Sequence, residues 1–265
     1  MQFPTTIPPK EQPSELPVPK LEIRNLTKVF GQGKQRITAV DDVSLSLAPN
    51  EFSCIVGPSG CGKSTLLSIA AGLSKATSGK ILVDGAPVPG PGADRGMVFQ
   101  NYTLFPWLSV AENVAFGLRL KGMAKAELNR RVAHYLDIVG LSGSAKAYPK
   151  ALSGGMKQRV AIARALANDP EVLLMDEPFG ALDSQTKEQL QSFFHDLWAK
   201  SHITVLMITH DVEEAIFLSQ RVHIMDKTGQ LHETITIDLP THRELDMKLT
   251  REFLDYKRHI VHALR

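Results

Sequence analysis

The sequence predicts an α/β fold built on a parallel sheet, and two observations support this prediction. Phe52–Val56, Val172–Met175 and Ile203–Ile208 are short, nearly continuous apolar runs, as expected of strands that are covered on both faces. Patterns typical of helices lie between and after these runs, near residues 63–72, 154–168, 184–199 and 211–219. Strands that alternate with helices in this way are typical of a parallel sheet.

A small antiparallel sheet is predicted from two runs that alternate between apolar and polar residues, Leu21–Leu26 and Val43–Leu47. Such alternation indicates strands with one face in the core and the other in water. The segment from about 101 to 165 differs, because it contains helical patterns such as Ala124–Val139. We expect it to form a helical subdomain inserted into the α/β core.

The chain is predicted to divide into a tail, a main domain and a C-terminal extension. Residues 1–19 hold six prolines, which fix φ and remove amide donors, so a disordered tail is expected, with a docking segment as the alternative. The main domain would span residues 20–240. In the extension, residues 241–265, the stretch His242–Leu264 has the apolar spacing of an amphipathic helix.

Composition excludes several classes of protein. The chain has 265 residues, 43% of them apolar, and a net charge of +2, which allows a full core and does not call for nucleic acid as a partner. Its two cysteines, Cys54 and Cys61, argue against a disulfide framework and for a reducing cytosol. No apolar run approaches the roughly 20 residues of a membrane helix, and no signal peptide is predicted.

A glycine-rich loop follows the apolar run Phe52–Val56 and opens a predicted helix. It matches G-x-x-x-x-G-K-[ST] and consists of Gly57, Pro58, Ser59, Gly60, Cys61, Gly62, Lys63, Ser64 and Thr65. Glycines let the backbone amides wrap a phosphate chain, and the following helix offers its positive end to the same anion. Lys63 would reach the β- and γ-phosphates of ATP, and Ser64 would offer its hydroxyl to Mg²⁺.

Two acids and a histidine end apolar strands that should share one edge of the sheet. Asp176 and Glu177 follow Val172–Met175, and His210 follows the next buried run. Ligands of open α/β sheets bind at this edge. Asp176 therefore suits the Mg²⁺ shell, and Glu177 suits the polarisation of an attacking water. His210 could contact the γ-phosphate, although a lone histidine is often structural.

The stretch Leu152–Arg159 reads LSGGMKQR, and here the chain resembles the ATP-binding subunits of ABC transporters. It departs from their common pattern at Met156, where glutamine is usual, and at Ala151, which replaces an acid. Ser153, Gly154 and Gly155 would begin a helix and form a second anion site. The resemblance implies that this site closes on the ATP of another subunit in a head-to-tail dimer.

The resemblance, which covers about residues 21–225, implies further roles for individual residues. It assigns Phe30 to stacking on adenine and groups Val40 with the nucleotide-binding residues. It assigns Gln100 to sensing the γ-phosphate and its metal, Asp183 to the loop that signals across the dimer, and His210 to the catalytic switch. For Phe30 the alternative is ordinary core packing at a strand end.

One import subgroup is suggested by GPGADRGMVFQ at Gly90–Gln100 and by Leu104–Leu108. These stretches resemble the corresponding motifs in the ATP-binding subunits of importers of nitrate, sulfonates, taurine and bicarbonate. The resemblance implies permease subunits and, indirectly, a solute-binding protein as partners, at the cytoplasmic face of the inner membrane. Phe105 and Trp107 would line a groove for a permease helix or pack in the core.

Three alternatives to this function remain open. The first is the motor of another class of ABC transporter. The second is a soluble ABC-type ATPase of DNA repair or translation, which would usually carry coiled-coil insertions or two motor halves, and this chain shows neither. The third is a regulatory nucleotide-binding module, against which the presence of Glu177 argues.

Overall fold

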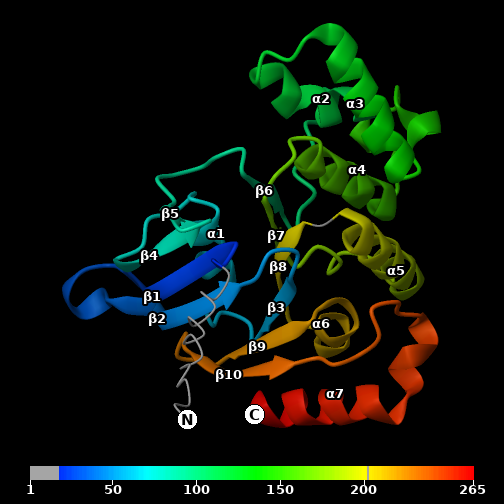
Figure 1. Ribbon diagram of the computed structural model, residues 1–265. Coiled ribbons are helices and arrows are strands. Elements are labelled where there is room, and N and C mark those ends of the chain that lie inside the picture. Colours follow the sequence, from blue (N-terminus) through cyan, green and yellow to red (C-terminus); the bar gives the residue numbers. More distant parts are fainter. Residues whose placement is uncertain (1–17, 202) are drawn as a thin grey trace, which may run out of the picture.

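The main sheet is parallel, as predicted (Figure 1). The computed structural model describes residues 18–201 and 203–265. The strand order is β10–β9–β3–β8–β7–β6, and only β10 runs antiparallel to its neighbour. The strands are β3 (Phe52–Val56), β6 (Arg95–Val98), β7 (Val172–Asp176), β8 (Thr204–Thr209), β9 (Arg221–Met225) and β10 (Leu231–Thr236). The three apolar runs of the sequence therefore lie in the interior of this sheet.

The second sheet is antiparallel, and its two predicted strands are longer than the sequence indicated. Its order is β2–β1–β4–β5, with β1 (Leu21–Phe30), β2 (Ile37–Leu47), β4 (Ser78–Val83) and β5 (Ala86–Pro87). Register shifts interrupt the pairing of β1 with β2, and each bulge breaks the strict alternation that reveals a strand in sequence. This explains why the extended parts of β1 and β2 were not predicted.

The main sheet separates two hydrophobic cores. Cys54 packs on one face with helices α4 (Gly154–Leu166), α5 (Ser184–Ser201) and α6 (Val212–Leu218), and its neighbour Ile55 packs on the other face with α1 (Lys63–Ala70) and the second sheet. Burial on both faces is what the continuous apolar strands predicted. Helix α1 ends before the predicted residue 72, because Gly72 adopts a left-handed φ of 75°.

The inserted segment is helical, as predicted, and has a third core of its own. It contains α2 (Val110–Leu120) and α3 (Lys125–Ile138). Ser109 and Glu112 form a capping box that starts α2. Helix α4 contributes Val160 to this third core and Ile162 to the core that contains Cys54. The helical subdomain and the α/β core therefore share α4.

The prediction of one helix over His242–Leu264 is wrong. A short 3-10 helix spans Leu245–Leu249, and α7 begins only at Arg251 and ends at Ala263. The break falls at Thr250, whose side chain accepts a hydrogen bond from the Phe253 amide, a cap that competes with helix continuation. Helix α7 lies along β10 and α6 (Figure 1).

Two expectations concern segments at the edges of the described structure. The proline-rich tail falls almost entirely on residues 1–17, which lie outside the described residues. The division into tail, domain and extension stays a prediction. Among the residues that the structure describes, none of the helices has both the length and the apolar character to cross a bilayer.

Candidate nucleotide site

The glycine-rich loop connects β3 to α1, and its backbone leaves no room for side chains at two glycines. A Cβ at Gly62, where φ is 105°, would lie 1.8 Å from the carbonyl oxygen of Ala39. A Cβ at Gly57 would lie 2.5 Å from the carbonyl oxygen of Met225. The close approach of neighbouring backbone therefore requires glycine at both positions. Gly60 has a φ of 80° and faces open space.

Lys63 is buried in the curve of this loop, with only 5% of its surface exposed. Its Nζ donates hydrogen bonds to the carbonyl oxygens of Gly57, at 2.8 Å, and Pro58, at 2.9 Å. The ammonium thus lies inside the curve of the loop, and its contact with phosphate stays a prediction. Cys61 is buried in the same loop, and both cysteines are free thiols, as predicted.

Ser64 and Asp176 meet at the mouth of the sheet. The Ser64 hydroxyl lies 3.1 Å from Oδ1 of Asp176. Burial raises the pKa of Asp176; the Ser64 hydroxyl opposes the rise, and the charge of Glu177 adds to it. A hydroxyl and a carboxylate at this distance are oxygen ligands of the kind that Mg²⁺ prefers.

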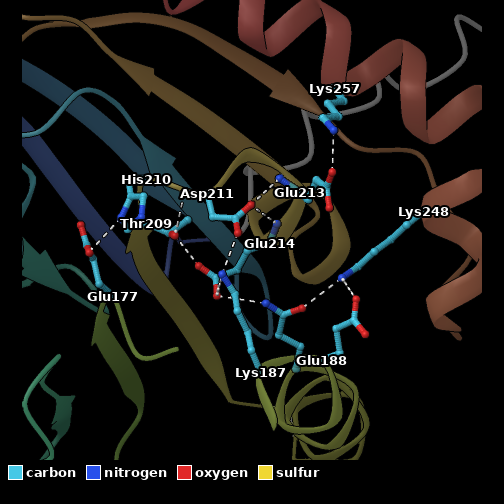
Figure 2. A network of polar contacts seen from close by, with 11 residues as sticks. Glu177, Lys187, Glu188, Thr209, His210, Asp211, Glu213, Glu214, Lys248 and Lys257 are labelled. Atoms are coloured by element: carbon cyan, nitrogen blue, oxygen red, sulfur yellow. Dashed lines mark hydrogen bonds and ion pairs between the residues drawn. The ribbon is translucent and has the colours of Figure 1, made fainter. Parts of the chain in front are cut away.

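Glu177 contacts two other predicted site residues, and Figure 2 shows its contact with His210. Its Oε2 lies 2.9 Å from Nδ1 of His210 and accepts a hydrogen bond of 3.3 Å from Nε2 of Gln100. Its backbone has a φ of 41°, and its amide donates to the Ile208 carbonyl at 3.0 Å. A left-handed conformation at a residue other than glycine is uncommon and concentrates at functional sites. Residues from three strand ends therefore converge: the sequence predicted a shared edge for Glu177 and His210, and the structure adds Gln100 to them.

The signature residues begin α4 at a different place on the surface. Ser153 is exposed and caps the helix by accepting a hydrogen bond from the Met156 amide. A Cβ on Gly154 would lie 3.0 Å from the Tyr102 hydroxyl, and one on Gly155 would lie 2.6 Å from Cγ2 of Thr186. Within the described ranges, no hydrogen bond joins Ser153 to the phosphate loop of its own chain.

Asp183 lies in the exposed loop before α5. Its carboxylate accepts a hydrogen bond of 3.0 Å from the Thr186 amide, and this bond holds the pKa of Asp183 below its usual value. Its carbonyl accepts a second bond, of 2.9 Å, from the Lys187 amide. Asp183 therefore fixes the start of α5.

Phe30, assigned to stacking on adenine, lies on β1, and Val40, grouped with the nucleotide-binding residues, lies on β2. Phe30 is 46% exposed at the end of β1, so the alternative of core packing for this ring is wrong. Nζ of Lys28 lies 4.8 Å from the centroid of the ring. Val40 is buried, and its Cγ2 would lie 3.5 Å from a Cβ on Gly62. The sheet of β1 and β2 thus borders the phosphate loop.

The loop after Gln100 is held by two residues that the sequence did not single out. Arg164 of α4 donates to the carbonyl oxygens of Thr103, at 2.7 Å, and Tyr102, at 3.3 Å. Asn113 of α2 is buried and donates to the carbonyls of three residues, Phe105, Leu108 and Ser109. Arg164 acts across a tertiary contact that no local pattern marks, whereas Asn113 binds the turn just before its own helix.

An aromatic groove lies beside this loop. Phe105 packs on Phe116 at 4.4 Å between ring centroids, whereas Trp107 is 70% exposed. A cavity of about 610 Å³ opens here, lined by Phe105, Phe116 and the exposed Leu120 among other residues. Phe105 is half-buried and lines this cavity, whereas Trp107 is exposed; the docking of a permease helix here stays a prediction.

The substitution Asn113→Ala should destabilise the fold measurably. We expect the free energy of unfolding to fall by about 3 kcal/mol, because each buried polar group left without a partner costs about 1–3 kcal/mol. Urea unfolding followed by fluorescence measures it. The exposed Asn101→Ala serves as control and should change the free energy by less than about 0.5 kcal/mol. Equal midpoints for the two variants would contradict this role.

Comparison with known proteins places the chain in a family. The sequence profile described as ABC transporter matches residues 40–180. The nitrate import ATP-binding protein NrtD of Synechocystis is 50% identical, over 92% of this chain and 95% of that protein. The taurine import ATP-binding protein TauB of Roseobacter denitrificans is 48% identical, over 80% of both chains.

Solved structures agree with this placement. The dimeric structure of the ATP-binding cassette MJ0796 in a post-hydrolysis state, bound to ADP and Pi, superposes with a TM-score of 0.73. It is 35% identical and covers 83% of this chain and all of that chain. The fold described above is thus the fold of such cassettes, and the predicted family is confirmed: the chain belongs to the ABC transporter family.

Proposed function

We propose that this chain is the subunit of an ABC importer that binds ATP and hydrolyses it to drive transport. The observation that carries the proposal is the convergence of Gln100 and His210 on the Glu177 carboxylate, next to the Ser64–Asp176 pair. A base, its orienting partners and a site for a metal-bound phosphate are the parts that phosphoryl transfer to water requires.

ATP would bind with its phosphates on the loop Gly57–Thr65. The loop amides and the start of α1 provide fixed positive potential, and Lys63 is already buried in the curve of the loop. The β- and γ-phosphates would replace the Gly57 and Pro58 carbonyls as acceptors for its ammonium. Phe30, whose ring is exposed, would stack on the adenine, with Val40 behind the loop.

Mg²⁺ would be held by Ser64 and Asp176, with Gln100 as a further oxygen ligand. The Ser64 hydroxyl and the Asp176 carboxylate lie 3.1 Å apart, and the burial that raises the pKa of Asp176 also strengthens its attraction to a cation. When bound, the metal neutralises charge on the β- and γ-phosphates.

Hydrolysis would begin with a water held by the Glu177 carboxylate. As the water oxygen attacks the γ-phosphorus, the bond to the leaving ADP oxygen breaks, and Glu177 accepts the proton of the water. His210 and Gln100 keep the carboxylate in place, since both contact its Oε2. Positioning and preorganised charge, rather than covalent chemistry, provide the rate acceleration.

A second motor subunit, identical or homologous, would complete each site. Ser153, Gly154 and Gly155 present a helix start whose serine is exposed, and this anion site would close on the γ-phosphate bound to the partner. Asp183 would carry the signal between the two sites. The dimeric arrangement of the related cassette MJ0796 supports this proposal.

The solute is proposed to be a small anion such as nitrate, a sulfonate, taurine or bicarbonate. The names of the relatives NrtD and TauB support this class. The permease subunits would dock beside Trp107, and a solute-binding protein would deliver the anion to them. The motor would then act as a peripheral subunit on the cytoplasmic face of the inner membrane.

An assay of the whole complex in proteoliposomes tests the proposal. The motor, its permease subunits and the solute-binding protein are challenged with a panel of these four anions, and phosphate release is followed. We expect one anion class to stimulate hydrolysis. Hydrolysis by the isolated chain that the permease leaves unchanged would favour a soluble ATPase, and complete absence of hydrolysis would favour a regulatory module.

A further inference from the structure

A partly buried charged cluster lies beside the Glu177–His210 pair (Figure 2). Its members are Lys187 on α5 and Asp211 and Glu214 at the start of α6. None of these residues belongs to the phosphate loop, the signature or the metal pair. Their contacts reach the backbone on both sides of His210.

The first contact fixes the residue before His210. Glu214 is only 2% exposed, and its Oε2 accepts a short hydrogen bond from the Thr209 hydroxyl. Its other oxygen accepts a bond of 3.1 Å from Nε2 of Gln191. Thr209 is the last residue of β8, so this bond ties the end of the strand to α6.

The second contact fixes the residue after His210. One carboxylate oxygen of Asp211 caps α6 by accepting from the amides of Glu213, at 2.9 Å, and Glu214, at 3.2 Å. The Asp211 amide donates to the Thr209 hydroxyl at 3.1 Å. Thr209 and Asp211 are therefore bonded to each other around His210.

One cation compensates both acids. Nζ of Lys187 lies 2.6 Å from Oδ2 of Asp211 and 3.8 Å from Oε1 of Glu214. Because Glu214 is almost fully buried, loss of Lys187 would leave its charge without a compensating cation. The imidazole of His210 is 62% exposed, so apart from its contact with Glu177 little side-chain packing holds it, and the backbone on either side helps to set its direction.

Lys187 also belongs to the first turn of α5. Its amide donates to the Asp183 carbonyl at 2.9 Å. The same residue therefore contacts the exposed loop before α5 with its backbone and the surroundings of His210 with its side chain.

We propose that Lys187 is a positioning residue for hydrolysis: through Asp211 and Glu214 it fixes the backbone around His210 and keeps the imidazole on Glu177. The expected effect on the rate of hydrolysis rests on the proposed function. It also links Asp183 to the surroundings of His210, because Lys187 donates its amide to the Asp183 carbonyl and pairs its ammonium with Asp211, the residue after His210.

The kinetic test compares variants in the reconstituted complex. Lys187→Met should lower kcat about tenfold and leave the KM for ATP within about twofold, since misplaced catalytic groups cost up to about 100-fold in rate. Lys187→Arg should retain most of kcat. The matched control is Lys257→Met. It removes a lysine of α7 that is bonded at 2.5 Å to Glu213 of α6, and it should leave kcat unchanged.

A double variant separates positioning from stability. Lys187→Met should lower the melting temperature, because it leaves the buried Glu214 charge uncompensated. Adding Glu214→Gln should restore much of the melting temperature but not kcat, since Asp211 still lacks its cation. If this double variant regains full kcat, or if Lys187→Met alone keeps it, the proposal is overturned.

A readout without turnover keeps the two proposals apart. The ring signal of His210 is identified by NMR as the histidine resonance that disappears in His210→Gln. It should shift in Lys187→Met and stay in place in Lys257→Met. If the wild-type complex shows no hydrolysis while this shift occurs, the proposed function fails and the positioning role stands. If the His210 ring signal is the same in the wild type, Lys187→Met and Lys257→Met, the positioning role is refuted, whatever the hydrolysis rate.

Discussion

Glu177→Gln is expected to reduce ATP turnover of the assembled transporter about 100-fold or more, the usual cost of losing a general base. Glutamine retains the size of the side chain and an oxygen that can accept from Gln100, but it cannot take a proton from water. ATP binding should persist, because the phosphate loop is untouched. Phosphate release under saturating ATP measures the turnover, and calorimetry measures the binding.

Glu171→Gln is the matched control for this substitution. Glu171 immediately precedes β7, whereas Glu177 immediately follows it, and Glu171 contacts Lys20 at 3.2 Å rather than the site. We expect turnover close to that of the wild type. Turnover of Glu177→Gln within about twofold of the wild type would rule out Glu177 as the base, since a lost base costs 10²-fold or more.

Lys63→Ala should abolish most of the ATP affinity. We expect the Kd for ATP to rise about 10- to 100-fold, because a hydrogen bond to a charged group contributes about 1.5–3 kcal/mol. Titration with ATP and calorimetric detection measures the Kd. Lys75→Ala, an exposed lysine just beyond α1, should bind as the wild type does, and unchanged affinity in Lys63→Ala would disprove the phosphate cradle.

The sequence was most informative where a structure depends on neighbours along the chain. The parallel strands were visible as apolar runs, because burial on both faces needs no particular partner. The phosphate loop was visible because Gly57 and Gly62 must accommodate close backbone. The convergence of Glu177 and His210 also followed, since the ends of parallel strands meet at one edge.

Other features depend on contacts that no local pattern encodes. The break at Thr250 follows from one side-chain cap that competes with a continuous apolar spacing. The hairpin of β9 and β10 went unpredicted, because β10 alternates only between half-buried and exposed residues. The cluster around Lys187 joins α5 to α6, and its residue types occur throughout the surface.

Coupling between ATP hydrolysis and solute uptake is the most direct test of the central claim. Phosphate release and accumulation of the labelled anion are measured in the same proteoliposomes, with wild-type and Glu177→Gln motors. The account predicts that both signals require ATP and that both disappear together in Glu177→Gln. Uptake that continues at the wild-type rate without hydrolysis would contradict it.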